Sequence, residues 1–113
     1  MFKLDKKEMM IQTLGKFVDM TSKELPDDVM AKLTELRAKE EKPLAKAIYD
    51  VMFENMDKAK KLSRPTCQDT GVIQFFVRTG AKFPYLGELR AILREATIRA
   101  TKSAPLRLNA VEV

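Results

Sequence analysis

The sequence contains no histidine and a single cysteine among its 113 residues. Without histidine, the commonest general base, the Cys–His nucleophile pair and most zinc sites are excluded. One cysteine excludes an intrachain disulfide, so Cys67 is an inert apolar group, a reactive thiol or a metal ligand. Any chemistry must therefore use carboxylates, hydroxyls, cations, this thiol or a cofactor, or must borrow groups from another chain.

Long apolar segments are also absent. No run approaches the roughly 20 residues that span a bilayer, and the N-terminus lacks the apolar stretch and cleavage site of a secretory signal. Hydrophobic residues make up 45% of the chain and charged residues 33%, which is typical of a globular protein and not of a disordered one. We therefore expect a cytoplasmic protein that does not bind membranes.

Positive charge is concentrated in the second half of the chain. Residues 1–63 hold 13 Lys and Arg against 12 Asp and Glu, whereas residues 64–113 hold 8 against 4. Six of the seven arginines lie in the second part. Arginine binds carboxylates and phosphates through two parallel hydrogen bonds. The bias is compatible with an anionic ligand, although a solvated basic face is the commoner explanation.

Apolar spacing predicts three helices within residues 1–62. The first is expected over about 5–20, with a break at Thr21 and Ser22. The second is expected to begin near Pro26 and the third at Pro43, because proline suits the first turn of a helix. The expected inward residues are Met10, Leu14, Phe17 and Val18 in the first helix, Val29, Leu33 and Leu36 in the second, and Leu44, Ile48, Val51, Met52 and Ala59 in the third.

The pattern changes after residue 62. A polar loop is followed by a β-branched and aromatic run at 72–77, which predicts a strand. A fourth helix is expected over about 87–101, with Leu89, Ile92, Leu93 and Ala96 inward and Arg90 and Arg94 outward. The alternating tail 106–113 predicts a second strand that stops in mid-pattern. The expected fold class is α+β: a helical array (1–62), then the loop, strand, helix and terminal strand (63–113). We expect residues 1–113 to be the leading segment of a larger domain.

The polar loop carries the most informative motif. Residues 64–71 read Arg-Pro-Thr-Cys-Gln-Asp-Thr-Gly. Proline and glycine mark a loop, and the polar neighbours of Cys67 are poor surroundings for a buried apolar cysteine. The local chemistry therefore favours a reactive thiol or a ligand over the inert alternative.

Three segments together resemble the class I iron–sulfur hydro-lyases, the family of class I fumarate hydratases and L(+)-tartrate dehydratases. They are residues 64–71, residues 83–89 (Phe-Pro-Tyr-Leu-Gly-Glu-Leu) and residues 104–112 (Ala-Pro-Leu-Arg-Leu-Asn-Ala-Val-Glu). The likeness extends over essentially the whole chain and is closest to the start of the α subunit in the two-subunit branch.

The resemblance implies an oxygen-sensitive 4Fe–4S cluster held by three cysteine thiolates, with Cys67 as the first ligand and the other two outside this sequence. It also implies that Gln68 binds a substrate carboxylate and that Asp69 is a catalytic residue for proton transfer. Arg107 would bind substrate, with Arg99 as the alternate. Because one thiolate cannot hold such a cluster, the isolated chain is expected to have no stable cluster and no turnover.

The implied reaction is dehydration of L(+)-tartrate to oxaloacetate and water, with fumarate–malate interconversion as the alternative. The expected partners are a small 2-hydroxy dicarboxylic acid and a β subunit, in an oligomer. Two readings from other classes stay open: a basic helical module that binds nucleic acid, which the net charge of +5 favours, and a non-catalytic subunit-interaction domain. The first leaves the cysteine loop unexplained, so no nucleic-acid partner is expected.

Overall fold

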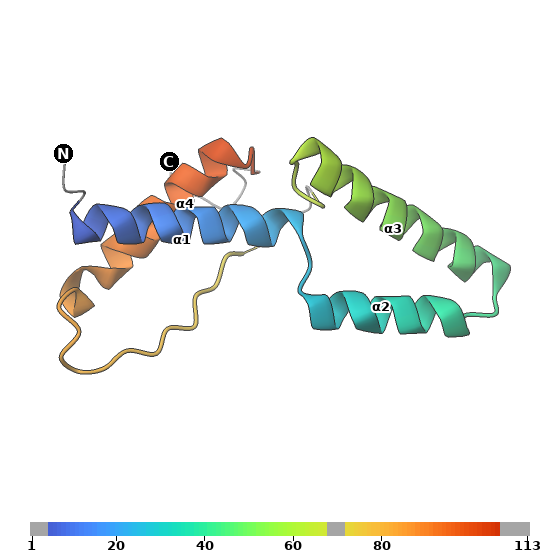
Figure 1. Ribbon diagram of the computed structural model, residues 1–113, viewed down its shortest axis with the longest axis horizontal. Coiled ribbons are helices and arrows are strands. Elements are labelled where there is room, and N and C mark those ends of the chain that lie inside the picture. Colours follow the sequence, from blue (N-terminus) through green and yellow to red (C-terminus); the bar gives the residue numbers. More distant parts are fainter. Residues whose placement is uncertain (1–4, 68–71, 107–113) are drawn as a thin grey trace. The chain divides into compact units, whose positions relative to one another are not determined.

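The structure is a computed structural model that describes residues 5–67 and 72–106. All regular secondary structure in these two ranges is helical (Figure 1). The elements in chain order are α1 (Lys6–Lys23), α2 (Asp27–Lys39), α3 (Pro43–Leu62), the 3-10 helix η1 (Leu86–Glu88) and α4 (Leu89–Ser103). None of these helices is long and apolar enough to cross a membrane.

The four expected helices are confirmed, with small changes at their ends. Pro43 opens α3 as its first residue, where its missing N–H costs no hydrogen bond. Pro26 precedes α2 as the N-cap instead of lying in its first turn. The predicted break at Thr21 and Ser22 is wrong, because α1 continues to Lys23. Neither residue forces a helix to end as proline or glycine does, and both have only modestly unfavourable helix propensity.

The described chain forms two compact units. The described residues of Met1–Asp19 and Gln68–Val113 make up unit 1, and those of Met20–Cys67 make up unit 2. Unit 1 therefore contains most of α1 together with η1 and α4, whereas unit 2 contains α2, α3 and the loop that leads to Cys67.

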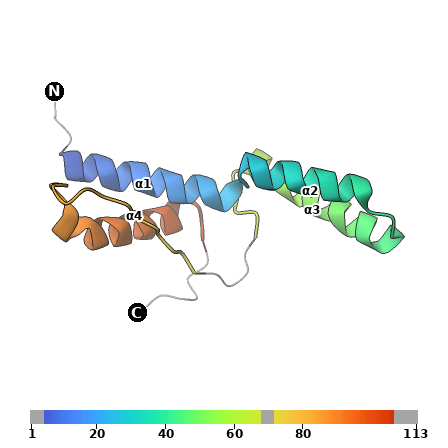
Figure 2. The same cartoon turned by 90° about the horizontal axis from the view of Figure 1, so that it is seen from below.

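Unit 1 has a small core between α1 and α4, which lie beside each other in Figure 2. Ile11, Ile92 and Ala96 are buried at its centre, and Tyr85 packs against them. Small residues let the helices approach closely: a Cβ atom added at Gly15 would lie 3.4 Å from the Ala96 carbonyl oxygen. The predicted inward face of α4 is confirmed. In the first helix the expected inward residues Met10, Leu14 and Val18 are confirmed. Phe17 is half exposed instead, and Ile11, which was not expected inward, is buried.

Unit 2 is a pair of helices joined by a short turn. The Arg37 guanidinium of α2 forms an ion pair with Asp50 and lies 4.8 Å from the ring centroid of Phe53, both on α3. The expected inward face of α3 is largely wrong: Leu44, for example, is 76% exposed. The exposed apolar residues of this face are Leu44, Ile48, Val51 and Met52, whereas Ala59 is buried and Tyr49, Phe53 and Met56 are partly buried.

The predicted α+β fold class is wrong, because the residues that the structure describes contain helices and no strand. Residues 72–80 have no regular secondary structure, and Val72 is 77% and Phe76 is 93% exposed. A strand requires a neighbouring backbone to pair with, and no residue of the described ranges is paired in this way. The predicted terminal strand, 106–113, lies outside the described residues except for Leu106.

Candidate functional site

The candidate site is the loop that follows α3. Cys67 is described and its side chain is exposed. Gln68, Asp69 and Arg107, the other expected site residues around it, lie outside the described residues. The alternate arginine, Arg99, lies on α4 in unit 1.

A helix-ending motif sends the chain from α3 toward Cys67. Ser63 adopts the left-handed conformation, with φ 52°. Its N–H donates to the Lys60 carbonyl at 3.2 Å, and the Arg64 N–H donates to the Ala59 carbonyl at 2.9 Å. These two bonds satisfy carbonyls at the end of the helix, as in a Schellman motif. Pro65 follows and prevents the helix from resuming. The direction of the loop is thus fixed by local backbone geometry.

Hydrogen bonds hold Thr66, the residue before Cys67, at both its N–H and its carbonyl. The Thr66 N–H donates to the Ser22 carbonyl at 3.0 Å, and its hydroxyl lies 3.4 Å from the same oxygen. The Asn55 side-chain amide of α3 donates to the Thr66 carbonyl at 2.7 Å. Ser22 belongs to the last turn of α1, whose carbonyls have no partner within their own helix. The loop therefore satisfies a helix end and is tied to a second helix.

Sequence reasoning missed Asn55. The only available signal was its spacing: Asn55 lies four residues after Val51, where the exposed apolar pattern of α3 would predict another hydrophobic side chain. Because Asn55 is exposed, an amide there is also ordinary for a solvated helix position, and spacing alone does not identify the loop carbonyl that it binds.

Arg99 is already engaged by two carboxylates. Its guanidinium donates through Nη1 and Nη2 to both carboxylate oxygens of Glu8 on α1. Its Nε donates to Glu95 at 2.8 Å. The hydrogen bond from Arg99, and then that from Gln12, lowers the pKa of Glu8 below its ordinary value. The Glu8 and Glu95 hydrogen bonds raise the pKa of Arg99. This arrangement links α1 to α4 at the edge of the unit 1 core.

Removing this link should change how the stability of the protein depends on pH. Because the folded-state pKa of Glu8 is lowered, the pair stabilises the fold above the ordinary pKa of 4.5 and this contribution is lost as pH falls through the lowered value. We expect Arg99→Gln to lower the thermal unfolding midpoint above pH 4.5 and the difference from wild type to shrink in more acidic buffer. Arg94→Gln, which alters an exposed arginine of the same helix, is the control. Equal differences at all pH values would contradict the expectation.

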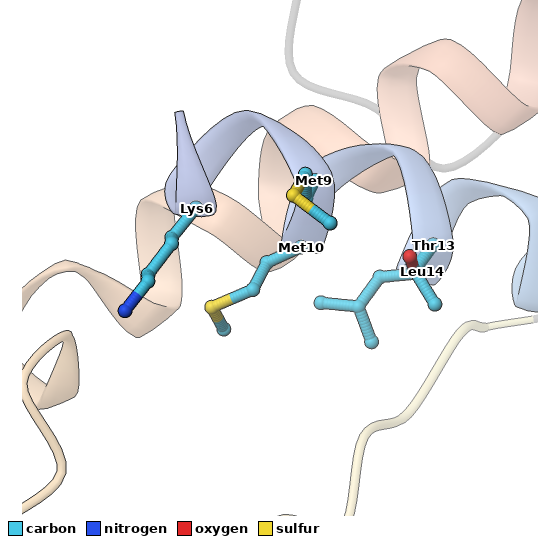
Figure 3. Close-up of a pocket in the computed structure, with 5 residues that line it drawn as sticks. All are labelled: Lys6, Met9, Met10, Thr13 and Leu14. Carbon is cyan, nitrogen blue, oxygen red and sulfur yellow. The ribbon is translucent and has the colours of Figure 1, made fainter. Parts of the chain in front are cut away.

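A surface depression on α1 lacks the groups that a catalytic site would need, so the Cys67 loop remains the candidate site. Its volume is about 400 Å³ and it is lined by Lys6, Met9, Met10, Thr13 and Leu14. Figure 3 shows that these side chains all come from one helix. Lys6 is their single ionisable group, so the lining offers no acid–base pair. Within the described ranges, no group of three or more His, Cys, Asp or Glu residues could hold a metal ion.

Comparisons with known proteins connect the chain to one family. The family model described as fumarate hydratase (fumerase) matches residues 11–113. The α subunit of L(+)-tartrate dehydratase from Escherichia coli is 51% identical over 102 residues, which cover 90% of this chain and 34% of that protein. The Shigella sonnei α subunit shows the same identity and coverage. A putative α subunit from Methanocaldococcus jannaschii is 34% identical over 89 residues, 77% of this chain and 31% of the relative.

The chain thus spans about a third of the length of the curated relatives that it matches. No solved structure matches it. The matched region includes the whole Cys67 loop and both arginines that were expected to bind substrate.

Proposed function

The chain belongs to the fumarate hydratase family, and we propose that it is part of a hydro-lyase that dehydrates L(+)-tartrate to oxaloacetate and water. The observation that carries this proposal is the 51% identity to L(+)-tartrate dehydratase α subunits across 90% of the chain. The more distant relative is named a putative L(+)-tartrate dehydratase α subunit. Fumarate hydration, which the name of the family model suggests, is the second candidate.

An iron–sulfur cluster of the 4Fe–4S type is the cofactor that we propose, with Cys67 as one ligand. The thiol is exposed and follows a tethered loop residue, and soft thiolates are the ligands that iron–sulfur clusters require. The residues therefore fit one ligand position. They do not complete the site, because the sequence holds no second cysteine. The remaining thiolates would come from polypeptide beyond this sequence.

The chain's own groups would bind and orient the substrate. A bound cluster would supply an iron that acts as a Lewis acid on the leaving hydroxyl group. We propose that the Gln68 amide donates a hydrogen bond to a substrate carboxylate and that Asp69 holds the proton destined for the hydroxyl oxygen. Arg107 is our first choice for a bidentate grip on a carboxylate. Arg99 is the second, because Glu8 and Glu95 already neutralise its charge.

The partner and compartment follow from the same proposal. Because the relatives are α subunits, we propose that the enzyme includes a β subunit and is an oligomer. An exposed ligand thiol requires a reducing environment to stay reduced, so we place the enzyme in the cytoplasm.

The direct test is an assay of the protein produced with its β subunit and purified without oxygen. We expect oxaloacetate to form from L(+)-tartrate faster than malate forms from fumarate at equal substrate concentration. A matched preparation exposed to air is the control, and it should lose activity together with its iron. Faster turnover of fumarate would replace the proposed substrate by the second candidate, and activity that survives complete loss of iron would refute the cluster.

A further inference from the structure

We propose that Asn55 is a positioning residue that fixes the backbone of the Cys67 ligand. This inference rests on the proposed function, in which Cys67 binds the cluster. It extends that function to a side chain that lies twelve positions away in the sequence, on a different element. Asn55, Thr66, Ser22 and Cys67 all belong to unit 2, so the arrangement is contained within one compact unit.

The geometry places the constraint on the peptide bond that enters Cys67. The Asn55 amide donates to the Thr66 carbonyl at 2.7 Å. That carbonyl is part of the planar unit that also contains the nitrogen and Cα of Cys67. On the other side of Thr66, its N–H is bound to the Ser22 carbonyl at 3.0 Å. With Thr66 held at both its N–H and its carbonyl, the peptide unit that positions the nitrogen and Cα of Cys67 is fixed. Only rotation about the bonds of Cys67 itself then remains to move its thiol.

Hydrogen-bond chemistry shows which atom of the Asn55 side chain is required. The partner is a carbonyl oxygen, which only accepts, so the NH2 group must face it. An aspartate has nearly the same shape but offers no donor when ionised. Asparagine is also a poor helix former compared with alanine or glutamine. Asn55 is exposed on α3 and gains nothing in helix propensity, so the bond to Thr66 is the contact that the structure shows for its side chain.

A ligand that is already held in place favours metal binding, because the loop does not lose further conformational entropy when the metal binds. Preorganised groups bind more tightly since less conformational entropy is lost on binding. Groups that orient metal ligands from outside the coordination sphere typically change metal affinity by roughly 10–100-fold. We therefore expect the Asn55 contact to act on retention of iron, and only through that on turnover.

The test compares Asn55→Ala, Asn55→Asp and Asn55→Gln in the anaerobically purified complex with the β subunit. The first measurement is the rate of iron loss to an added iron chelator, and the second is hydrogen exchange of the Thr66 amide. We expect Asn55→Ala and Asn55→Asp to lose iron about 10-fold faster and to exchange the Thr66 amide faster than wild type. Asn55→Gln keeps the donor on a longer arm and should be intermediate. Lys46→Ala, at an exposed site of the same helix, should behave as wild type.

The outcomes distinguish the positioning role of Asn55 from the proposal that Cys67 binds the cluster. Wild-type iron loss in Asn55→Ala and Asn55→Asp, with no iron in Cys67→Ser, would overturn the role of Asn55 and leave ligation by Cys67 intact. Faster Thr66 exchange without faster iron loss would likewise reduce Asn55 to a structural tether. Iron retained in Cys67→Ser would overturn both proposals. If Asn55→Ala folds poorly, the rates of iron loss from Asn55→Gln and Asn55→Asp are compared instead, because both keep a polar side chain at this position. Equal rates in these two variants would then overturn the role of the Asn55 donor.

Discussion

Replacing Cys67 by serine is expected to remove the iron and acid-labile sulfide of the anaerobically purified complex and with them its brown absorbance. A serine oxygen is a harder ligand than a thiolate, and iron–sulfur clusters need three or four cysteine ligands. Changes to groups that merely orient a metal ligand already lower metal affinity or activity by about 10–100-fold. Loss of a ligand should therefore reduce dehydratase turnover by on the order of 100-fold or more. Iron and sulfide analysis together with an oxaloacetate assay measures both effects.

The same substitution should leave the fold unchanged. The Cys67 side chain is exposed, and surface substitutions usually change stability by less than about 0.5 kcal/mol. Far-UV circular dichroism and thermal unfolding of the metal-free protein should thus match wild type, which distinguishes lost ligation from lost structure. Full iron content in Cys67→Ser would show that this thiol is not a ligand, and the proposed function would then lack its principal residue.

Replacing Ile92 by alanine should cause the largest loss of stability of any truncation to alanine among the described residues of unit 1. Ile92 is fully buried between α1 and α4, and truncating a buried isoleucine to alanine typically costs about 2–5 kcal/mol. The core around it is small, so few neighbours are available to fill the space. Urea unfolding followed by circular dichroism measures the change in free energy. If Ile92→Ala fails to fold, Ile92→Val is measured instead, and it should lower the free energy of unfolding by about 0.5–1.5 kcal/mol.

The matched control is Ile98→Ala on the same helix. Ile98 is 42% exposed, so less of its surface is removed from water on folding, and the same substitution should cost under about 1 kcal/mol. The helix propensity gained is equal in the two variants because both are isoleucine-to-alanine changes within α4. A cost for Ile98→Ala as large as that for Ile92→Ala would show that α4 packs through a different face.

Local signals in the sequence were sufficient for the helices. Pro43 marks the first residue of α3, and the spacing of Ile92 and Ala96 gives the buried face of α4. Both signals act within one or two turns, where a residue's own backbone preference or its neighbours three and four positions away decide the outcome. The family was likewise readable from short motifs, as the match over residues 11–113 confirms.

The predictions that failed depend on partners distant in sequence. Residues 72–77 have the composition of a strand, but composition does not supply the second strand, and the described chain leaves Phe76 exposed. In α3, two apolar faces compete, and the structure places Tyr49 and Phe53 in the partly buried one while Leu44 faces solvent. Periodicity identifies that a helix has apolar faces but does not say which of them meets a neighbour.

The amino-acid sequence by itself determined the helices, the single thiol in a polar loop and the family to which the chain belongs. All three are properties of short segments and of residue identity. Only the tertiary structure brought Asn55 and Ser22 to Thr66, joined Glu8 to Arg99, and brought Ile11 into one core with Ile92 and Ala96. Each of these pairings joins residues separated by more than a helical turn, and the packing of whole helices decides which residues meet.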